Sequence, residues 1–385
     1  ALTPQPTPEP TPEPTPEPTP QPPARQLDIR LSDRDREANL LDEYHRSYST
    51  FRPRAELRVY ADEPIGNLYL VWNTHTVPYE ILAGGERVAC GQNGWLHEYV
   101  ELPVPATELT IVMPDQEMDL CDILAFTEGS PHEKAQVWEP PCEQADVLVF
   151  PTHSDDEFLF FGGIIPIYGR ELGYQVQVVY FTNHYVGAER YRCHELLNGL
   201  WAAGVTHYPI PGPFRDWIAD SLEVARDRYG WDNSVAYQVE LIRRFKPLVI
   251  VEHAENGEYG HGVHMLNAYA MEQAVYDAAD PAKFPESAEK YGVWDTPKLY
   301  LHLYGDDPTI LNYEYPLESF GGMTGFEMAK LCYTYQLSQQ HWDFHVYDYG
   351  SDYDCHRFGL FRSLVGEDVE KNDLMEHIDL AAYGR

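Results

Sequence analysis

The run ADVLVF, residues 145–150, is a continuous apolar strand that leads directly into the polar segment PTHSDDE, residues 151–157. Two similar runs follow, QVQVVYFT at 175–182 and PLVIVEH at 247–253, and HYPIP at 207–211 reads as a short strand between them. Helical patterns separate and follow these strands at 157–172, 192–203, 235–245 and 264–278. Continuous apolar strands alternating with helices predict an α/β fold, a Rossmann-like, mostly parallel sheet covered by helices, over residues 145–385.

Residues 26–144 carry a different pattern, in which strand-like runs are separated by Gly, Pro, Asn and Asp. The runs are AELRVYA (55–61), NLYLVWNT (67–74), PYEILAG (78–84), LHEYVELP (96–103), ELTIVMP (108–114) and CDILAFTE (121–128). This spacing predicts an antiparallel β-sandwich of jelly-roll type, preceded by a helix or ordered leader at 31–46. Such an accessory domain is expected either to bind carbohydrate or to cap the domain that follows.

Residues 1–25 contain the repeat PTPEPTPEPTPEPT, in which alternating proline favours extended polyproline II and prevents a packed core. The segment is typical of a spacer between a cell envelope and a secreted enzyme, and a disordered intracellular tail is the alternative. A chain that opens on Ala1 is taken as a mature form, and we expect a secreted or cell-surface protein.

The charge balance is strongly acidic, with 62 Asp and Glu against 27 Lys and Arg and a net charge of −35. A nucleic-acid partner is excluded, since phosphate neutralisation needs a basic surface, and so is docking on an anionic membrane. We expect no transmembrane segment, because the longest apolar run is far shorter than the roughly 20 residues a span needs. The stalk holds few of the acids, so the charge lies on the folded parts, and where the mouth of a site shares it, neutral ligands are favoured over polyanionic glycans.

Six cysteines are scattered through the chain without CxxC or zinc-finger spacing. They suit a few extracellular disulfides or buried free thiols equally well, and Cys332 with Cys355 is the pairing we favour.

Metal-competent side chains follow two strands of the predicted sheet where each strand ends. PTHSDDE follows the first, and NGEYGHGVH, residues 256–264, follows PLVIVEH. Ligands of such sheets bind beyond the carboxyl ends of the strands, so the two loops can converge. An imidazole and a carboxylate from the first loop with an imidazole from the second form a catalytic zinc set. Each cluster alone also suits a helix start, where Asp accepts free N–H groups; their coincidence at one sheet edge favours the metal site.

The two motifs resemble those of the PIG-L (LmbE-like) zinc de-N-acetylases, a family that removes acetyl from N-acetylglucosaminyl substrates. The resemblance extends over about residues 145–278 and includes Arg192-x-x-Glu195. It implies one Zn²⁺ per chain, held by His153, Asp156 and His264.

The same resemblance implies the roles of the remaining residues. Asp155 would be the general base for the zinc-bound water, His261 would polarise the carbonyl or protonate the leaving amine, and Tyr259 would help hold the oxyanion. Arg192 and Asp216 would contact the substrate.

Two departures from the family pattern bear on substrate specificity. The usual His-Pro-Asp-Asp-Glu reads His-Ser-Asp-Asp-Glu here, and His-Pro-Asp-His reads His-Gly-Val-His, without its middle carboxylate. We therefore expect a zinc-dependent hydrolase that releases acetate and a free amine from an N-acetylglucosamine-type sugar or glycan. The alternatives are a non-catalytic carbohydrate-binding or envelope protein with a vestigial metal site, and a zinc amidase for a non-sugar N-acyl compound.

Overall fold

The computed structural model describes residues 22–185, 187 and 189–385. The predicted stalk at 1–25, with the tether to a cell envelope inferred from it, falls almost wholly outside these residues. Secretion and the predicted domain boundaries at 25 and 144 stay predictions. No helix in the described part of the chain is long and apolar enough to cross a membrane.

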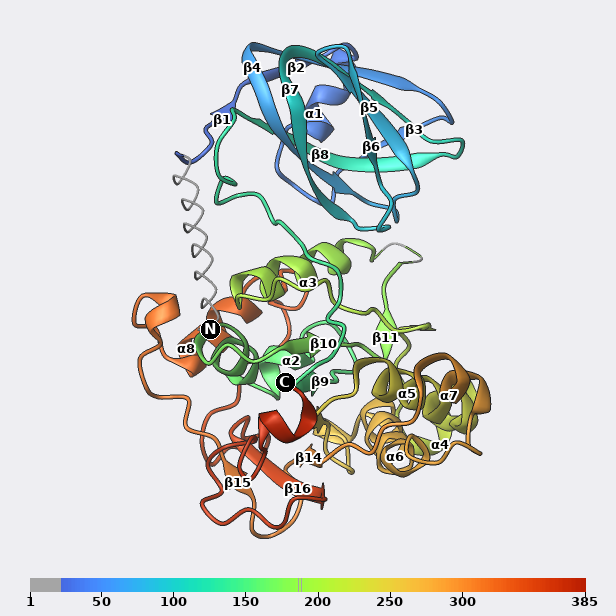
Figure 1. The fold of residues 1–385 in the computed structure, drawn as a ribbon, viewed down its shortest axis with the longest axis vertical. Helices are drawn as coiled ribbons and strands as arrows, with labels where there is room; N and C mark the ends of the chain where they lie inside the picture. Colours follow the sequence, from blue (N-terminus) through green and yellow to red (C-terminus); the bar gives the residue numbers. More distant parts are fainter. Residues whose placement is uncertain (1–21, 186, 188) are drawn as a thin grey trace, which may run out of the picture.

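The first part of the chain forms one eight-stranded sheet in which all strand pairs are antiparallel (Figure 1). Its strands are β1 (Gln26–Leu27), β2 (Ile29–Leu31), β3 (Ser49–Phe51), β4 (Glu56–Trp72), β5 (Tyr79–Ala83), β6 (Glu86–Cys90), β7 (His97–Val112) and β8 (Met118–Phe126). Alternate residues of β4 enter different clusters, with Leu68 and Leu70 in the main core and Tyr69 and Val71 in a second one. A sandwich consists of two packed sheets, whereas all eight strands here belong to one hydrogen-bonded sheet. The jelly-roll sandwich therefore stays a prediction.

Two pairs of runs that the sequence separates are single long strands. β4 contains both AELRVYA and NLYLVWNT, and its pairing with β7 shifts register between Tyr60 and Asn67, around Pro64 and Gly66. β7 likewise continues through two prolines, at 103 and 105. Proline and glycine can sit in bulges that bend a strand as well as at its ends, so the predicted breaks are wrong. The sequence also gave no sign of β6, whose side chains lack a buried alternating face. The predicted helix or leader at 31–46 begins on the last residue of β2 and contains a 3-10 turn at Arg34–Arg36 and the short α1 (Glu37–Leu40).

The second part of the chain is mixed α/β and is built on a six-stranded sheet of order β10-β9-β13-β14-β16-β15. Its strands are β9 (Val147–Val149), β10 (Val176–Val178), β13 (Val249–Glu252), β14 (Lys298–His302), β15 (Thr309–Ile310) and β16 (Arg357–Ser363). The pairs among β10, β9, β13 and β14 are parallel, and β16 pairs antiparallel with β14 and β15. β11 (Thr182–Asn183) and β12 (Phe214–Arg215) form a separate parallel pair.

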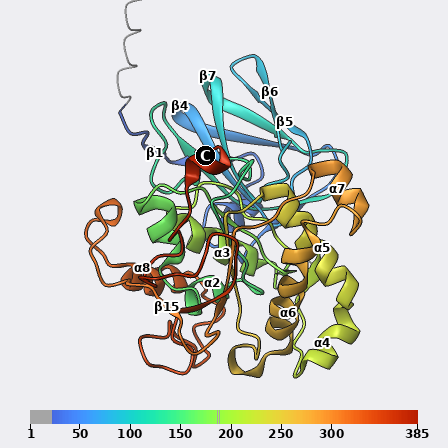
Figure 2. The same ribbon diagram turned by 60° about the horizontal axis from the view of Figure 1, so that its bottom comes forward.

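Helices cover both faces of this sheet (Figures 1 and 2). They are α2 (Asp156–Leu159), α3 (Tyr191–Ala202), α4 (Leu222–Tyr229), α5 (Trp231–Phe245), α6 (Gly262–Asp277), α7 (Pro285–Tyr291) and α8 (Gly325–Tyr333). Val147 and Val149 pack with α2, α3 and α8, whereas Leu148 packs with α5 and α6. Successive strand side chains point to opposite faces, which explains why the strands had to be apolar throughout. The finer description as Rossmann-like stays a prediction.

Two predicted elements of this part are wrong. The helix expected at 157–172 is α2, then a turn at Gly162 with φ +54°, then a π-helical segment at Ile165–Glu171. The strand expected at HYPIP makes only isolated bridges, including one between Val179 and Ile210, because its two prolines lack the N–H group that a ladder needs.

All six cysteines are buried and free. The favoured pairing of Cys332 with Cys355 is therefore wrong. Cys332 lies on α8, and the Cys355 Sγ lies 3.7 Å from the neighbouring His356 Nδ1. Of the two alternatives that the sequence left open, the structure has buried free thiols.

Candidate metal centre

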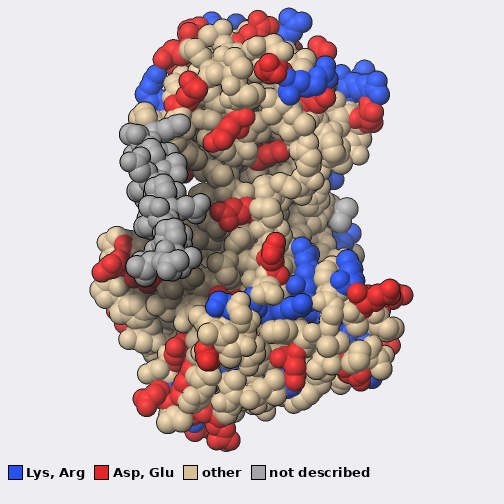
Figure 3. All heavy atoms as spheres, viewed as in Figure 1, with Lys and Arg blue, Asp and Glu red and all other residues tan. Residues whose placement is uncertain are grey.

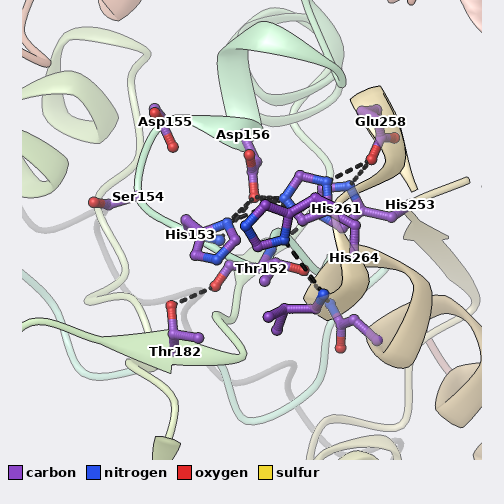
Figure 4. A network of polar contacts seen from close by, with 12 residues as sticks. Thr152, His153, Ser154, Asp155, Asp156, Thr182, His253, Glu258, His261 and His264 are labelled. Atoms are coloured by element: carbon purple, nitrogen blue, oxygen red, sulfur yellow. Dashed lines mark hydrogen bonds and ion pairs between the residues drawn. The ribbon is translucent and has the colours of Figure 1, made fainter. Parts of the chain in front are cut away.

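The two loops singled out by the sequence leave the sheet side by side. β9 and β13 are parallel neighbours, with Val149 opposite Val251, so both chains leave the sheet at the same edge. The first loop runs into α2, and the second reaches the start of α6 through a 3-10 turn at Glu258–Gly260. Figure 4 shows side chains from both loops pointing toward one another.

The three predicted metal ligands converge. The distances are 3.2 Å from His153 Nδ1 to Asp156 Oδ2, 3.3 Å from His264 Nε2 to the same oxygen, and 3.1 Å between the two nitrogens. All three side chains are buried. Zinc bound tetrahedrally at about 2.0–2.1 Å separates its nitrogen and oxygen ligands by about 3.3 Å, so this triangle has the size that a zinc ion needs. The residues present therefore fit the metal.

A buried carboxylate, Glu258, fixes the orientation of one ligand. Its Oε2 lies 2.7 Å from His264 Nδ1, so that nitrogen carries the proton and Nε2 keeps its lone pair for the metal. The carboxylate also lies 2.8 Å from His253 Nδ1 and 2.6 Å from His302 Nδ1. Burial alone would raise the pKa of Glu258, but its electrostatic interaction with the His253 ring and the hydrogen bonds from the three imidazoles hold it well below its ordinary value.

His253 lies beside the metal centre, and its nitrogens already have partners. His253 Nε2 is 3.4 Å from Asp156 Oδ2 and could join a donor set with Asp156 and His264. However, Nε2 accepts the backbone N–H of Thr152 at 3.0 Å, and Nδ1 faces Glu258. Its lone pair is therefore used, which favours His153 as the ligand and leaves His253 with a structural, hydrogen-bonding role.

Asp155, the predicted general base, is buried beside Asp156. It directly precedes the ligand Asp156, and its backbone φ of 156° is unusual for a residue other than glycine. Its backbone N–H donates to the buried Glu157 at 2.8 Å, and its Oδ1 lies 3.6 Å from Arg192 Nη2. Burial raises the pKa of Asp155 to about 7, against the opposing charge of Arg192. Bound metal would lower this value, so that the carboxylate is ionised at neutral pH.

His261 and Tyr259 lie beside the rings of the predicted ligands. The His261 ring centre is 4.8 Å from that of His153, and its Nδ1 accepts the N–H of Val263 at 3.3 Å, so Nε2 carries the proton. Burial lowers the pKa of His261 to about 2, so the ring is neutral. Tyr259 is 41% exposed, with its ring centre 5.8 Å from that of His261, and burial of its hydroxyl raises its pKa well above 10. Both side chains are thus neutral hydrogen-bond donors.

The two predicted substrate contacts, Arg192 and Asp216, lie next to the metal centre and pair with each other. Arg192 Nη1 is 3.4 Å from Asp216 Oδ2, and Nη2 donates to the Ser154 carbonyl at 3.1 Å. Asp216 Oδ1 is also 3.5 Å from His153 Nε2, behind the ligand. Their contacts in the structure are with the protein, and their role toward substrate stays a prediction.

Two residues of the centre were missed by sequence reasoning. Glu258 stood inside the quoted NGEYGHGVH segment without a role, although an imidazole ligand ordinarily has a carboxylate behind it. His302 ends β14, the parallel neighbour of β13, so the strand-end rule that found the two loops could have found it.

No protein-family model matches the chain. It is 29% identical over 184 residues to "1D-myo-inositol 2-acetamido-2-deoxy-alpha-D-glucopyranoside deacetylase 1" of Catenulispora acidiphila, covering 42% of this chain and 56% of that one. It is 30% identical over 178 residues to the deacetylase of the same description from Geodermatophilus obscurus, covering 40% and 60%. The chain thus spans less than two thirds of the length of these relatives.

Among solved structures, the chain is similar to N,N'-diacetylchitobiose deacetylase from Pyrococcus horikoshii. The TM-score is 0.36 and the identity 19%, over 52% of this chain and 72% of that one. A likeness of this size carries no argument about the site.

Proposed function

We propose that this chain, a member of the PIG-L (LmbE-like) deacetylase family, hydrolyses the N-acetyl amide of an N-acetylglucosamine-type sugar and releases acetate and a free amine. The observation that carries the proposal is the triangle of His153, Asp156 and His264 donor atoms, 3.1–3.3 Å on each side, with Asp155 beside it. The names of the curated relatives, which are deacetylases of an acetamido sugar, support the substrate class.

We propose that Zn²⁺ is the metal, held by His153, Asp156 and His264. When bound, it supplies a water of lowered pKa and a Lewis acid for the amide carbonyl. Glu258 keeps His264 in the tautomer whose Nε2 faces this position.

The protein's own groups then move the protons. Asp155 accepts a proton from the attacking water, since its carboxylate adjoins the ligand set and the Arg192 guanidinium favours its ionised form. His261 Nε2–H and the Tyr259 hydroxyl are neutral donors beside the predicted ligands, suited to the developing negative charge on the carbonyl oxygen. Asp155, which holds the proton taken from the water, passes it to the nitrogen of the leaving amine as the C–N bond breaks, and His261 keeps its own proton as a donor to the carbonyl oxygen.

The test is acetate release from a panel of N-acetylated mono- and oligosaccharides and N-acyl peptides. We expect acetate from the acetamido sugars, its loss after chelation, and its recovery with Zn²⁺. Asp155→Asn should lower kcat by at least about 10²–10³-fold with metal content unchanged, because it removes the base and keeps the ligands. Full activity in the metal-free chain, or unchanged activity in Asp155→Asn, would contradict the proposal. Glycan binding without any hydrolysis would favour the non-catalytic alternative.

A further inference from the structure

A second cluster of imidazoles lies between the antiparallel sheet and α3. It consists of His45 on the loop before β3, His97 at the start of β7, and His194 on α3, and we call it the junction cluster. One ring nitrogen from each lies within 4.8 Å of the others. The ring centres are 5.1–5.4 Å apart. His97 and His194 are buried and His45 is half-buried.

Side chains behind His97 direct its lone pair into the cluster. His97 Nδ1 lies 2.8 Å from Gln136 Oε1 and 2.7 Å from the Tyr69 hydroxyl. Trp138 Nε1 also donates to Gln136 Oε1, which identifies that atom as the acceptor. The proton of His97 is therefore on Nδ1, and Nε2 presents its lone pair 2.9 Å from His194 Nδ1. A donor partner behind one ring nitrogen is what orients a metal-ligating histidine.

A buried carboxylate oxygen completes the surroundings. Asp122 is fully buried, and its Oδ2 lies 3.7 Å from His45 Nε2 with no hydrogen-bond partner among the described residues. Its other oxygen accepts the N–H of Glu43 at 2.9 Å. A buried carboxylate oxygen without a partner is costly, and a cation beside it would remove that cost. Burial also lowers the pKa values of all three imidazoles, His45 to about 4, so they are neutral and able to ligate at pH 7.

We propose that the junction cluster is a second metal site, for a divalent transition ion of the Zn²⁺ class, with His45, His97 and His194 as ligands and Asp122 Oδ2 as the fourth. Three imidazoles and one carboxylate are a donor set that zinc accepts, and four protein ligands are typical of a structural rather than a catalytic site. His97 Nε2 and His194 Nδ1 already lie 2.9 Å apart, so the His45 nitrogen, within 4.8 Å of the others, is the one that must approach to about 3.3 Å, and the half-buried loop carrying His45 is the segment placed to move. A hollow of about 460 Å³ lined by His45, Arg46, His194 and Glu195 gives the ion an entry path.

The competing explanation is a chain of hydrogen bonds without metal. His194 Nδ1–H would donate to His97 Nε2, and the Cys121 thiol, 3.8 Å from His194 Nε2, would donate to that nitrogen. That chain gives no role to His45 and leaves Asp122 Oδ2 unpaired.

A metal here would join two parts of the fold. Two of its ligands and Asp122 belong to the antiparallel part, and His194 belongs to α3, which also carries Arg192 beside Asp155. The ion would therefore fix α3 against the antiparallel sheet and, through it, the Arg192 guanidinium. Because bound metal stabilises only the folded chain, unfolding should depend on its concentration.

Counting metal in five full-length proteins, the wild type and four variants, tests the proposal. Each is stripped with chelator, reloaded with Zn²⁺ or Co²⁺ and desalted, and bound metal is measured by mass spectrometry. We expect about two ions per chain in the wild type, about one in Asp156→Ala, about one in His45→Ala and nearly none in the double variant. His132→Ala, a half-buried histidine of the same part outside the cluster, should keep both ions. Co²⁺ bound in Asp156→Ala should show the intense visible bands of tetrahedral coordination.

A conservative variant separates the metal site from the hydrogen-bond chain. His194→Asn keeps a donor where Nδ1 faces His97, so it should lose the ion and the metal-dependent rise in Tm while still folding. Metal content of Asp156→Ala that stays near zero, or that is unchanged by both His45→Ala and His194→Asn, would overturn the second site and leave the proposed function intact. If His45→Ala loses one ion and Asp156→Ala loses none, the result would support the second site and contradict the zinc centre of the proposed function.

Discussion

The two histidine clusters of this molecule differ in how the chain builds them. The strand-end cluster of His153 and His264 comes from two loops that leave neighbouring parallel strands at one sheet edge. The junction cluster comes from a loop, a strand and a helix that the topology of the sheets does not bring together by rule. The first can be found from strand order, whereas the second exists only once the two parts have packed.

The clusters also differ in the groups around their donor atoms. Beside the strand-end triangle stand Asp155, a carboxylate outside the ligand set, and His261, a neutral donor. Among the described residues of the junction cluster, Asp122 Oδ2 is the only carboxylate oxygen without a hydrogen-bond partner. The groups behind His97 only orient the His97 ring. A base and a hydrogen-bond donor outside the ligand set are suited to catalysis. A ligand set without such groups is suited to a structural ion.

The largest expected effect contrasts one ligand from each cluster. His264→Ala should lower kcat/KM for acetate release by at least about 10³-fold, because it removes a ligand of the reacting centre. His45→Ala should stay within a few-fold of wild type at 25 °C. Acetate assays on both purified variants at matched concentration measure this. Equal losses of kcat/KM in the two variants would contradict the assignment of catalysis to the strand-end cluster and of a structural role to the junction cluster.

A smaller effect is expected from the carboxylate behind His264. Glu258→Gln keeps the shape but weakens the acceptor for three imidazoles, so zinc affinity should fall about 10–100-fold. Competition with a chromophoric chelator measures the affinity. Glu255→Gln, three residues earlier on the same loop, is the control and should match wild type. An unchanged affinity in Glu258→Gln would remove Glu258 from the metal centre.

Asp122→Asn should change stability in opposite directions with and without metal. Burial raises the pKa of Asp122 to about 7, so above pH 7 the charged carboxylate destabilises the metal-free fold. Asp122→Asn should therefore raise the free energy of unfolding of the chelated protein at pH 8 by on the order of 1–2 kcal/mol. In the loaded protein it should lower stability, because a ligand is lost. Urea unfolding in both states measures it, and a change of the same sign in both would count against the metal.

The smallest effect concerns acid. His45 has a pKa near 4 in the fold, lowered by burial against the opposing charges of Asp42 and Glu43. The unfolded chain binds its proton near pH 6.5, so the stability this histidine contributes is present above that pH and is lost as the pH falls toward 4. Stability of the chelated wild type should therefore fall more steeply from pH 6.5 to 4 than that of His45→Ala, by about 1–2 kcal/mol. Parallel slopes would place His45 in water rather than in the cluster.

Sequence reasoning reached the α/β fold of the second part and the convergence of its two loops because both follow from apolar strands and strand order. Its predictions are wrong where proline or glycine can stand either at the end of a strand or inside it. The Pro and Gly between AELRVYA and NLYLVWNT predict a break, but Pro64 and Gly66 lie inside a continuous β4, and the HYPIP run is apolar enough for a strand but lacks two N–H donors. The distant partners His97 and His194 carry no local pattern, so no sequence signal for the junction cluster exists.

The charge of −35 is spread over both parts of the fold (Figure 3). Acidic side chains are scattered across the visible face, while basic side chains gather at the edge of the antiparallel part and in one cluster below the junction. Because this cluster breaks the acidic surface, the expectation that polyanionic glycans are disfavoured needs a direct binding comparison of neutral and anionic sugars.

The backbone at Asp155 has a consequence for how this protein can change. With φ at 156° and ψ at −29°, the residue lies outside the regions that residues other than glycine ordinarily occupy, at a cost of about 1–3 kcal/mol. A mutation to glycine would relieve that strain and delete the carboxylate at the same time. Selection for thermal stability alone would therefore favour glycine at this position, and the protein would become inactive. Selection for turnover would keep the aspartate despite its cost in stability.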